Sequence, residues 1–388
     1  MNTEELIKIE DDYFINTFTR QPIVLDHGEG VKVTDTEGKE YLDMFAGIAV
    51  NALGHNHPKL VEAIKKQAEK LIHVSSIYYN EPALVYAKKL IDLTSFDRIF
   101  YANSGAEANE GALKLAVKYT GKNEIISTVE SFHGRTLATL AATGHDEYHE
   151  PFKSILPQGF INVPYNDIEA IKEAVTENTA AIIVEPVQGE GGVNIPDSDY
   201  LKEISKLCRE NDIVFIVDEV QTGFGRCGSL FTHELFEVEP DIMTVAKGIG
   251  GGVPMGAILA KEEIAGAFVP GDHGTTFGGG PLVCAAANAT LDVIIEDDLL
   301  SNSRIVGQYL KDELTKLMEN HDNIKEVRGC GLMVGVELTV PGAEYVDKLR
   351  EKGFLINCTA DKVLRLVPPL IITKDSIDEF VKALDETL

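Results

Sequence analysis

The chain has 388 residues, a length that favours one large domain with a smaller one over a single core. Its hydrophobic fraction of 44% and charged fraction of 25% are ordinary for a globular protein. Acidic residues outnumber basic ones, 62 against 35, and the net charge of −27 argues against binding to nucleic acid or to an anionic membrane.

The first 14 residues, MNTEELIKIEDDYF, are acidic and lack the apolar run of a signal peptide. No later stretch is long and apolar enough to span a membrane. The cysteines are odd in number and contain no C-x-x-C pair, which indicates free thiols in a reducing compartment. We therefore expect a cytoplasmic protein. The cysteines are Cys208, Cys227, Cys284, Cys330 and Cys358.

Residues 21–43 are typical of short strands and turns, with Gly30 and Gly38 at hairpin bends. The middle of the chain then alternates apolar runs with amphipathic stretches, and several of the runs are continuous in Ile and Val. This alternation predicts a mainly parallel sheet in an α/β fold. We expect strands at 98–102, 124–129, 180–185, 213–218 and 242–246, and helices at 106–121 and 198–212.

Beyond residue 290 the pattern changes to a long amphipathic helix, a strand at 328–338, a further helix and a strand that begins at 363. This mixture resembles the N-terminal segment more than the middle of the chain. We therefore predict a large domain over 55–290 and a smaller α+β domain formed by 1–54 and 291–388.

Open α/β sheets bind ligands at the carboxyl ends of their strands, and polar residues follow several of these ends here. Ser104 and Gly105 begin a helix after the strand at 98–102, where they could bind a phosphate or simply cap the helix. Phe132 and Arg135 follow the strand at 124–129. They could stack on a ring and bind a carboxylate, or they could pack in the core and face solvent.

Two further strand ends carry a carboxylate and an amine. Asp218 could bind the proton of a ring nitrogen, or it could cap nearby N–H groups. Lys247 leaves a buried strand for a glycine-rich loop, where desolvation would make its amine more nucleophilic, unless it is a surface lysine. Together the four strand ends supply the groups that bind and tune pyridoxal 5'-phosphate.

A glycine motif at 223–228 matches G-x-G-x-x-G and offers a different class, an NAD-dependent dehydrogenase. The residues DEVQT separate this motif from the preceding strand, and the segment after it is a poor candidate for a helix. His55 and His57 lack carboxylate partners in the sequence and are more typical of a turn, so we expect no metal site.

Ordered blocks along nearly the whole chain resemble the class-III aminotransferases, the ornithine and 4-aminobutyrate type. The blocks include NSGAEANEGALKLA (103–116), SFHGRT (131–136), VEPVQGEGGV (184–193), VDEVQTGFGRCG (217–228), AKGIGGGVPMGA (246–257) and LRLVPPLII (364–372). The resemblance implies a pyridoxal-phosphate-dependent transferase of fold type I. Such a fold has a large domain with a mostly parallel seven-stranded sheet, a smaller α+β domain, and a homodimer with shared active sites.

The resemblance also implies the role of each cofactor-binding residue. Lys247 would form the Schiff base and then move the proton, and Asp218 would pair with the pyridinium nitrogen. Gln221 would lie beside the phenolic oxygen. The remaining cofactor-binding residues implied are Ser104, Gly105 and Ala106 at the phosphate, Phe132 on the ring, Glu219 and Val220 in the same loop as Asp218, and Thr276 of the partner subunit at the phosphate.

For the substrates, the resemblance implies that Arg135 binds the α-carboxylate of an acylated ornithine, with Thr275 of the partner subunit nearby. Arg365 would bind the α-carboxylate of glutamate, and Glu190 would pair with Arg365 when an ω-amino substrate is bound. Three positions depart from the family pattern, namely Ala106 for threonine, Thr275 for serine and Gly280 for asparagine. They leave catalysis intact but weaken the inference about the substrate.

The expected reaction transfers the distal amino group of N2-acetyl-L-ornithine to 2-oxoglutarate. It yields N-acetyl-L-glutamate 5-semialdehyde and L-glutamate, a step of arginine biosynthesis. Related donors remain as alternatives: ornithine, 4-aminobutyrate, succinylated diaminopimelate and carrier-bound lysine. A catalytically silent protein that only binds the cofactor is a further alternative.

Overall fold

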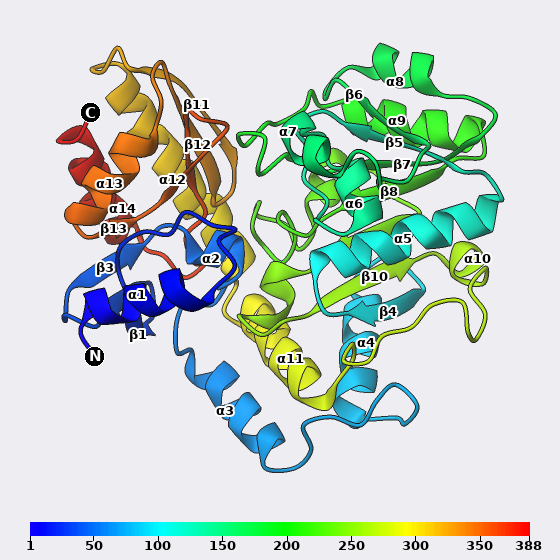
Figure 1. The fold of residues 1–388 in the computed structure, drawn as a ribbon, viewed down its shortest axis with the longest axis horizontal. Helices are drawn as coiled ribbons and strands as arrows, with labels where there is room; N and C mark the ends of the chain where they lie inside the picture. Colours follow the sequence, from blue (N-terminus) through cyan, green and yellow to red (C-terminus); the bar gives the residue numbers. More distant parts are fainter.

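A computed structural model describes residues 1–388, and its centre is a seven-stranded sheet (Figure 1). Only β10 runs antiparallel to its neighbours; all other adjacent pairs are parallel. The expected fold class, α/β with a mostly parallel seven-stranded sheet, is confirmed. In spatial order the strands are β4 (Arg98–Ala102), β10 (Gly256–Ala260), β9 (Ile242–Val245), β8 (Val214–Asp218), β7 (Thr179–Val184), β5 (Glu124–Thr128) and β6 (Phe160–Val163).

Helices cover both faces of this sheet, because alternate residues of its strands belong to different cores. Ile183 of β7 packs in the core that contains α5 (Gly105–Thr120), whereas Ile182 packs in the core that contains α9 (Tyr200–Glu210). Continuous burial of β7 and β8 explains why their sequences are apolar throughout. The other helices of this part are α6 (Leu137–Ala142), α7 (Asp146–His149), α8 (Ile168–Ala174) and α10 (Glu262–Ala265).

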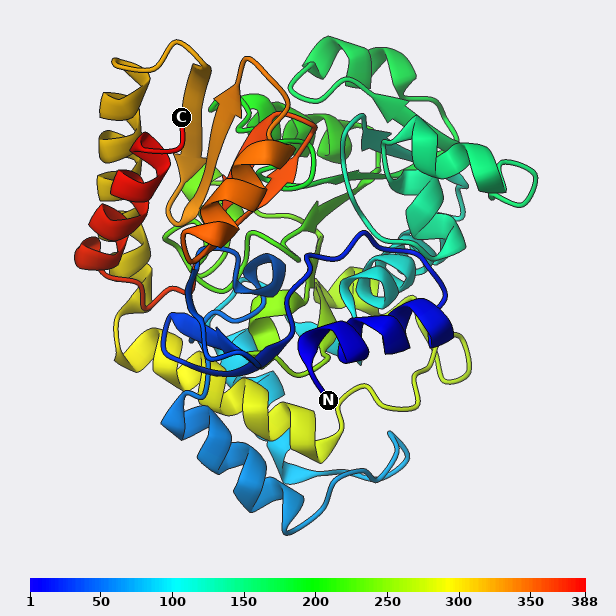
Figure 2. The same cartoon turned by 60° about the vertical axis from the view of Figure 1, so that its left-hand side comes forward.

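Two smaller sheets form beside the central one from the two ends of the chain. One has the order β1 (Leu25–Glu29), β2 (Lys32–Asp35), β3 (Glu40–Asp43), β13 (Phe354–Leu355), and β13 pairs parallel with β3. The other has the order β11 (Ile324–Cys330), β12 (Met333–Leu338), β15 (Val363–Leu366), β14 (Asn357–Thr359). In Figures 1 and 2 the N-terminal strands and the C-terminal elements therefore lie side by side.

The C-terminal helices are α12 (Leu299–Met318), α13 (Ala343–Glu351) and α14 (Lys374–Asp385), and α11 (Pro281–Glu296) precedes them. One hydrophobic core of 44 buried residues joins α11, β9 and β15. Because this core is continuous, the boundaries at 54/55 and 290/291 stay a prediction. The remaining helices are α1 (Thr3–Tyr13), α2 (Ala46–Ala49), α3 (Pro58–Ala68), α4 (Glu81–Asp92) and the 3-10 turns η1 (Glu150–Phe152), η2 (Thr232–Phe236) and η3 (Lys247–Gly250).

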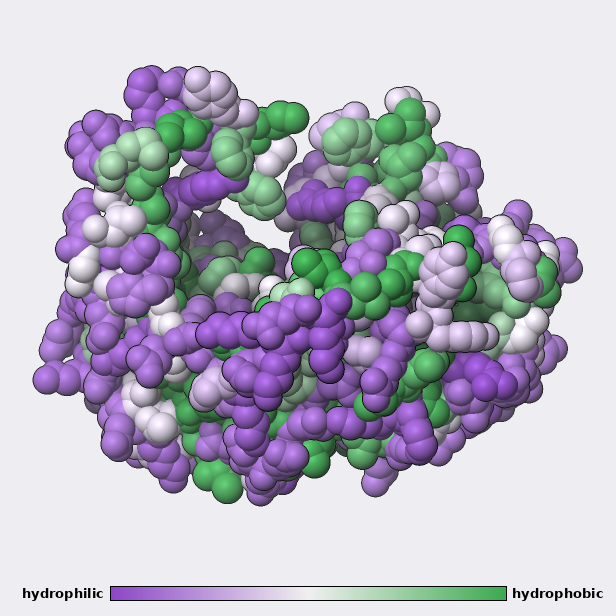
Figure 3. All heavy atoms as spheres, turned by 90° about the horizontal axis from the view of Figure 1, so that it is seen from below, coloured by the Kyte–Doolittle hydropathy of each residue, from purple (hydrophilic) through white to green (hydrophobic).

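The face of the molecule drawn in Figure 3 is mostly hydrophilic, with scattered apolar residues, and a notch separates two projections at its upper edge. Among the helices, none combines the length and the apolar character that crossing a membrane requires.

Candidate active site

The segments that follow β4, β5, β7, β8 and β9 meet around one cavity of about 410 Å³. This is the edge of the sheet where ligands of α/β proteins bind. The structure thus brings together the four strand ends that the sequence singled out. Among the predicted site residues, the cavity is lined by Ser104, Gly105, Ala106, Phe132, Arg135, Asp218, Val220, Gln221 and Lys247.

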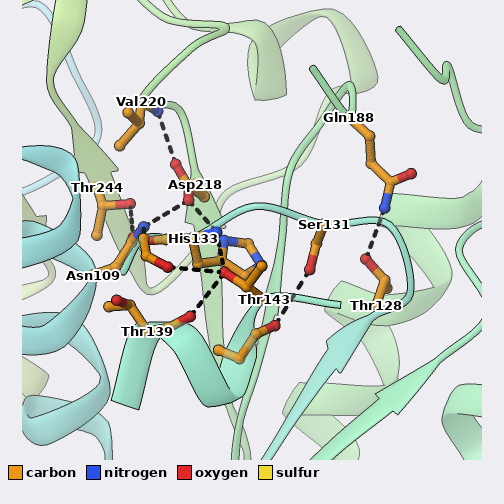
Figure 4. Close-up of polar contacts among 12 residues, drawn as sticks. Asn109, Thr128, Ser131, His133, Thr139, Thr143, Gln188, Asp218, Val220 and Thr244 are labelled. Atoms are coloured by element: carbon orange, nitrogen blue, oxygen red, sulfur yellow. Dashed lines mark hydrogen bonds and ion pairs between the residues drawn. The ribbon is translucent and has the colours of Figure 1, made fainter. Parts of the chain in front are cut away.

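Asp218 lies at the end of β8 with 2% of its surface exposed, and three donors hold its carboxylate (Figure 4). Oδ2 accepts from Asn109 Nδ2 at 2.7 Å and lies 2.7 Å from His133 Nδ1, while Oδ1 accepts from Val220 N at 2.9 Å. Thr244 Oγ1 in turn donates to Asn109 Oδ1 at 2.6 Å. These partners supply the hydrogen bonds that a buried carboxylate at the cavity requires.

Lys247 begins η3, separated by one residue from the end of β9, and lines the cavity. Its backbone has φ 46°, a conformation that costs free energy for a residue with a side chain and is often found at functional sites. Burial of Lys247 lowers the pKa of its amine to about 8, and the nearby Glu190 carboxylate partly offsets this effect. With this pKa about one tenth of the amine is neutral at pH 7, and the neutral form can attack a carbonyl.

The N-terminus of α5 forms one end of the cavity. Ser104 caps this helix and accepts from Glu107 N at 3.1 Å, while the first backbone N–H groups of the helix remain free for an anion. A Cβ atom at Gly105 would lie 2.7 Å from Val220 Cγ1, so glycine is required for this close approach. Ser104 can therefore cap α5 and also lie beside a bound phosphate.

Phe132 and Arg135 lie on the loop between β5 and α6, and this loop packs against α5, where Asn109 Nδ2 donates to His133 O at 2.8 Å. Arg135 is exposed toward the cavity, and its Cζ lies 5.4 Å from the centre of the Phe132 ring. No carboxylate of the chain pairs with this guanidinium. A cation free at the mouth of the cavity can bind a substrate carboxylate.

Arg365 and Glu190 lie next to the cavity and pair with each other. Arg365 Nη1 donates to Glu190 Oε1 at 2.6 Å and to Gln221 Oε1 at 3.2 Å. The Arg365 side chain is 1% exposed and that of Glu190 is 28% exposed. Burial alone would raise the pKa of Glu190, but the adjacent Arg365 guanidinium outweighs this effect and holds the pKa below its usual range. The pair is therefore ionised at neutral pH.

Besides Glu190 and Arg365, three predicted residues do not line the cavity of their own chain. Glu219 is fully buried on the other side of its loop, where its carboxylate accepts from His233 N at 2.7 Å and binds Thr222. Thr275 Oγ1 accepts from Asn103 Nδ2 and from Gly278 N, each at 3.1 Å. Thr276 is exposed at the surface. The Glu219 carboxylate thus binds Thr222 and His233 and does not face the cavity.

Residues of the site that sequence reasoning missed are Asn109, His133, Thr244 and Glu185. Glu185 directly follows β7, and its Oε2 is buried at the cavity without a hydrogen-bond partner. Burial, with Asp218 nearby, raises the pKa of Glu185 well above its usual range. A carboxylate at the end of an all-apolar strand was the signal used for Asp218, and the same signal could have identified Glu185.

The residues fit pyridoxal phosphate. The free N–H groups of α5 suit its phosphate, the buried Asp218 suits its protonated ring nitrogen, and Lys247 suits its aldehyde. Glu185 Oε2 is a buried polar atom that still lacks a partner in this cavity. The seven-stranded fold and this site define a pyridoxal-phosphate-dependent transaminase.

The glycine motif at 223–228 gives no dinucleotide-binding turn. Gly225 and Gly228 have φ 91° and 98°, and the segment continues into turns and η2 instead of a crossover helix. Between these glycines, the buried guanidinium of Arg226 donates to Leu332 O at 3.0 Å and to Pro368 O at 2.5 Å. The motif therefore attaches the central sheet to the C-terminal strands, and the dehydrogenase alternative is not supported.

Comparison with known proteins agrees with this class. The family model "Aminotransferase class-III" matches residues 15–388. The chain is 54% identical over 388 residues to the acetylornithine aminotransferase of Methanothermobacter thermautotrophicus, covering 100% of this chain and 99% of that protein. It is 55% identical over 394 residues to that of Methanocaldococcus jannaschii, covering 100% and 98%.

A solved structure, the ornithine aminotransferase from Toxoplasma gondii, matches with a TM-score of 0.96 at 33% identity. This match covers 100% of the present chain and 95% of that one. The chain belongs to the class-III aminotransferases.

Proposed function

We propose that this enzyme transfers the distal amino group of N2-acetyl-L-ornithine to 2-oxoglutarate, forming N-acetyl-L-glutamate 5-semialdehyde and L-glutamate. The relatives named above, at 54% and 55% identity over the whole chain, support this choice. The observation that carries it in the site is the unpaired guanidinium of Arg135 at the cavity mouth. It suits the α-carboxylate of a donor whose reacting amine lies at the other end.

Bound pyridoxal phosphate supplies an electron sink for the carbon that carries the amine. The Nζ atom of Lys247 would bind the cofactor covalently at rest. Once displaced by the substrate amine, Lys247 would take the proton from the reacting carbon and donate it to the cofactor, as its pKa of about 8 allows. Asp218, held in place by Asn109 and His133, would keep the ring nitrogen protonated.

The ion pair between Arg365 and Glu190 would select between the two substrates. The δ-carbon of acetylornithine carries no carboxylate, and with Glu190 bound to Arg365 no uncompensated cation faces it. Glutamate carries a carboxylate on its reacting carbon, and this group would replace Glu190 on Arg365. One arginine could then serve both half-reactions.

We also propose a homodimer in which Thr276 of the partner subunit binds the phosphate. Thr276 lies within an exposed apolar surface, to which Ile77, Tyr79 and Phe277 contribute with 81%, 92% and 64% of their area exposed. The surface is formed by residues 73–80 and 276–279, and these two segments contact each other. The rings of His73 and Phe277 lie 5.3 Å apart, and Asn80 Nδ2 donates to Gly279 O at 3.0 Å. Apolar surfaces of this kind mark interfaces.

A panel of amine donors tests the proposal. We expect kcat/KM with 2-oxoglutarate to be highest for N2-acetyl-L-ornithine, followed by L-ornithine, succinylated diaminopimelate and 4-aminobutyrate. A clear preference for ornithine or 4-aminobutyrate would reject the substrate but keep the class, and carrier-bound lysine can be added as a further donor. Failure of every amine would indicate a silent protein. We also propose that the enzyme is cytoplasmic, since its free cysteines suit a reducing compartment.

A further inference from the structure

The guanidinium of Arg135 is held by an aromatic ring that the proposed mechanism does not use. Its Cζ lies 3.6 Å from the centre of the Tyr148 ring, much closer than the 5.4 Å to the centre of the Phe132 ring. The shorter distance is that of a guanidinium in direct contact with an aromatic face. Tyr148 is therefore the principal contact of Arg135 within the chain.

This kind of contact leaves the donors of the arginine free. A guanidinium has five N–H groups that lie in its plane, and a ring stacked on its face uses none of them. In the structure the Arg135 side chain makes no hydrogen bond and no ion pair, although the chain contains 62 acidic residues. Tyr148 can thus fix the direction of the guanidinium and still leave its fork available for a carboxylate.

Tyr148 is itself held in place by the local fold. It lies in the short helix α7, half-buried, and its ring packs against that of His145 with centroids 4.9 Å apart. His149 Nε2, from the same helix, lies 2.8 Å from Leu140 O in α6. The Tyr148 ring is therefore held by the residues around it and is not an exposed side chain that moves freely.

The absence of a side chain at Gly144 allows the segment that carries Tyr148 to lie close to the loop that carries Arg135. Gly144 N donates to Ser131 O at 3.0 Å, and Glu130 N donates to Gly144 O at 2.7 Å. A Cβ atom at position 144 would lie 2.0 Å from Thr128 O, so only glycine permits this approach. The chain thereby returns to the loop that carries Arg135 before α7 begins.

We propose that Tyr148 is a positioning residue that sets the preference for donors carrying a carboxylate, because its ring face holds the Arg135 guanidinium at the cavity mouth. The inference rests on the proposed function, which assigns Arg135 to the α-carboxylate of the donor. It adds that Tyr148 acts only through Arg135 and takes no part in the chemistry at Lys247.

The test compares two amines that differ in one group: N2-acetyl-L-ornithine and N-acetyl-1,4-diaminobutane, the same amine without the carboxylate. The variants are Tyr148→Leu, which removes the ring, Tyr148→Phe, which keeps it, Arg135→Leu, and the double variant of Arg135→Leu with Tyr148→Leu. For Tyr148→Leu we expect KM for acetylornithine to rise about 10-fold with kcat within about twofold, and no change with the decarboxylated amine. Tyr148→Phe should match the wild type.

In the background of Arg135→Leu, adding Tyr148→Leu should have no further effect on either amine, since the two residues act in series. Equal losses on both amines, or an additive loss in the double variant, would overturn the role of Tyr148. If wild type and Arg135→Leu already treat the two amines alike, the assignment of Arg135 to the donor carboxylate fails instead. If Arg135→Leu discriminates as expected and Tyr148→Leu equals the wild type, only the inference about Tyr148 fails.

Discussion

Asn109 Nδ2 donates to Asp218 Oδ2 at 2.7 Å, and this bond joins residues 109 positions apart in the chain. Asn109 lies fully buried on α5, the helix whose N-terminus forms the anion site. A single helix thus supplies the proposed phosphate site and one of the hydrogen-bond donors to Asp218, the proposed partner of the ring nitrogen. The phosphate end and the nitrogen end of the cavity are therefore held at a fixed separation.

Replacing Asn109 by leucine removes one of the three donors to Asp218. We expect the half-reaction with the amine donor to slow about 10-fold, because a buried carboxylate that loses a partner is less favourably ionised. Thr244→Val is the matched control, since the Thr244 hydroxyl donates to Asn109 but makes no hydrogen bond to the Asp218 carboxylate, and its effect should be smaller. Stopped-flow absorbance measures both rates. An unchanged rate in Asn109→Leu would show that this bond does not support Asp218.

The pKa of Lys247, about 8, predicts how fast the cofactor-free enzyme binds pyridoxal phosphate. Only the neutral amine attacks the aldehyde, so the rate should rise about tenfold per pH unit below pH 8 and level off above it. The rate is followed by absorbance in the cofactor-free wild type. A rate that keeps rising through pH 10 would show an ordinary, solvated lysine.

Glu190→Gln removes the charge that pairs with Arg365 and keeps the shape of the side chain. Arg365 would then be uncompensated, which favours a substrate that carries a carboxylate on its reacting carbon. We expect the ratio of kcat/KM for acetylornithine to that for glutamate to fall about 10-fold. As a control, Asn357→Ala removes only a neutral hydrogen bond to Arg365 Nε at 3.2 Å and should change the ratio little. A ratio unaltered in Glu190→Gln would contradict the selecting role of the pair.

A shared active site predicts that two inactive subunits can restore activity together. Lys247→Ala lacks the amine, and Thr276→Asp places a negative charge at the proposed phosphate contact. In a mixed dimer one site takes Lys247 from one chain and Thr276 from the other, and is intact. After co-refolding of equal amounts we expect about a quarter of the wild-type activity, because half of the dimers are mixed and each has one intact site. No recovery in mixed dimers would place Thr276 in its own chain's site.

Part of the fold was predictable because burial leaves a clear trace in the sequence. β7 and β8 are buried on both faces and are continuous runs of Ile, Val, Ala and Phe, so the expected strands at 180–185 and 213–218 are confirmed within a residue or two. β6 and β10 were not predicted. β10 is the short segment GAILA, whose small residues suit a strand or a helix equally, and only its pairing with β4 and β9 decides.

The residues of the site also fall into those that a local sequence pattern predicts and those that it does not. Residues at strand ends, such as Asp218 and Lys247, could be found from local pattern alone. The ion pair between Arg365 and Glu190 spans 175 positions, and it was expected only through the family resemblance. Asn109 looked like any polar residue on a helix, because nothing local shows that it meets Asp218. The role of Thr276 depends on a second chain and stays a prediction.

The covalent bond between Lys247 and the cofactor is the central claim, and chemical reduction tests it most directly. Borohydride treatment of the enzyme with pyridoxal phosphate, followed by peptide mass spectrometry, should find the cofactor fixed to Lys247. Addition of N2-acetyl-L-ornithine before the reduction should leave Lys247 unmodified, because the donor amine displaces it. A label on another lysine, or a label on Lys247 that this donor does not prevent, would contradict the account.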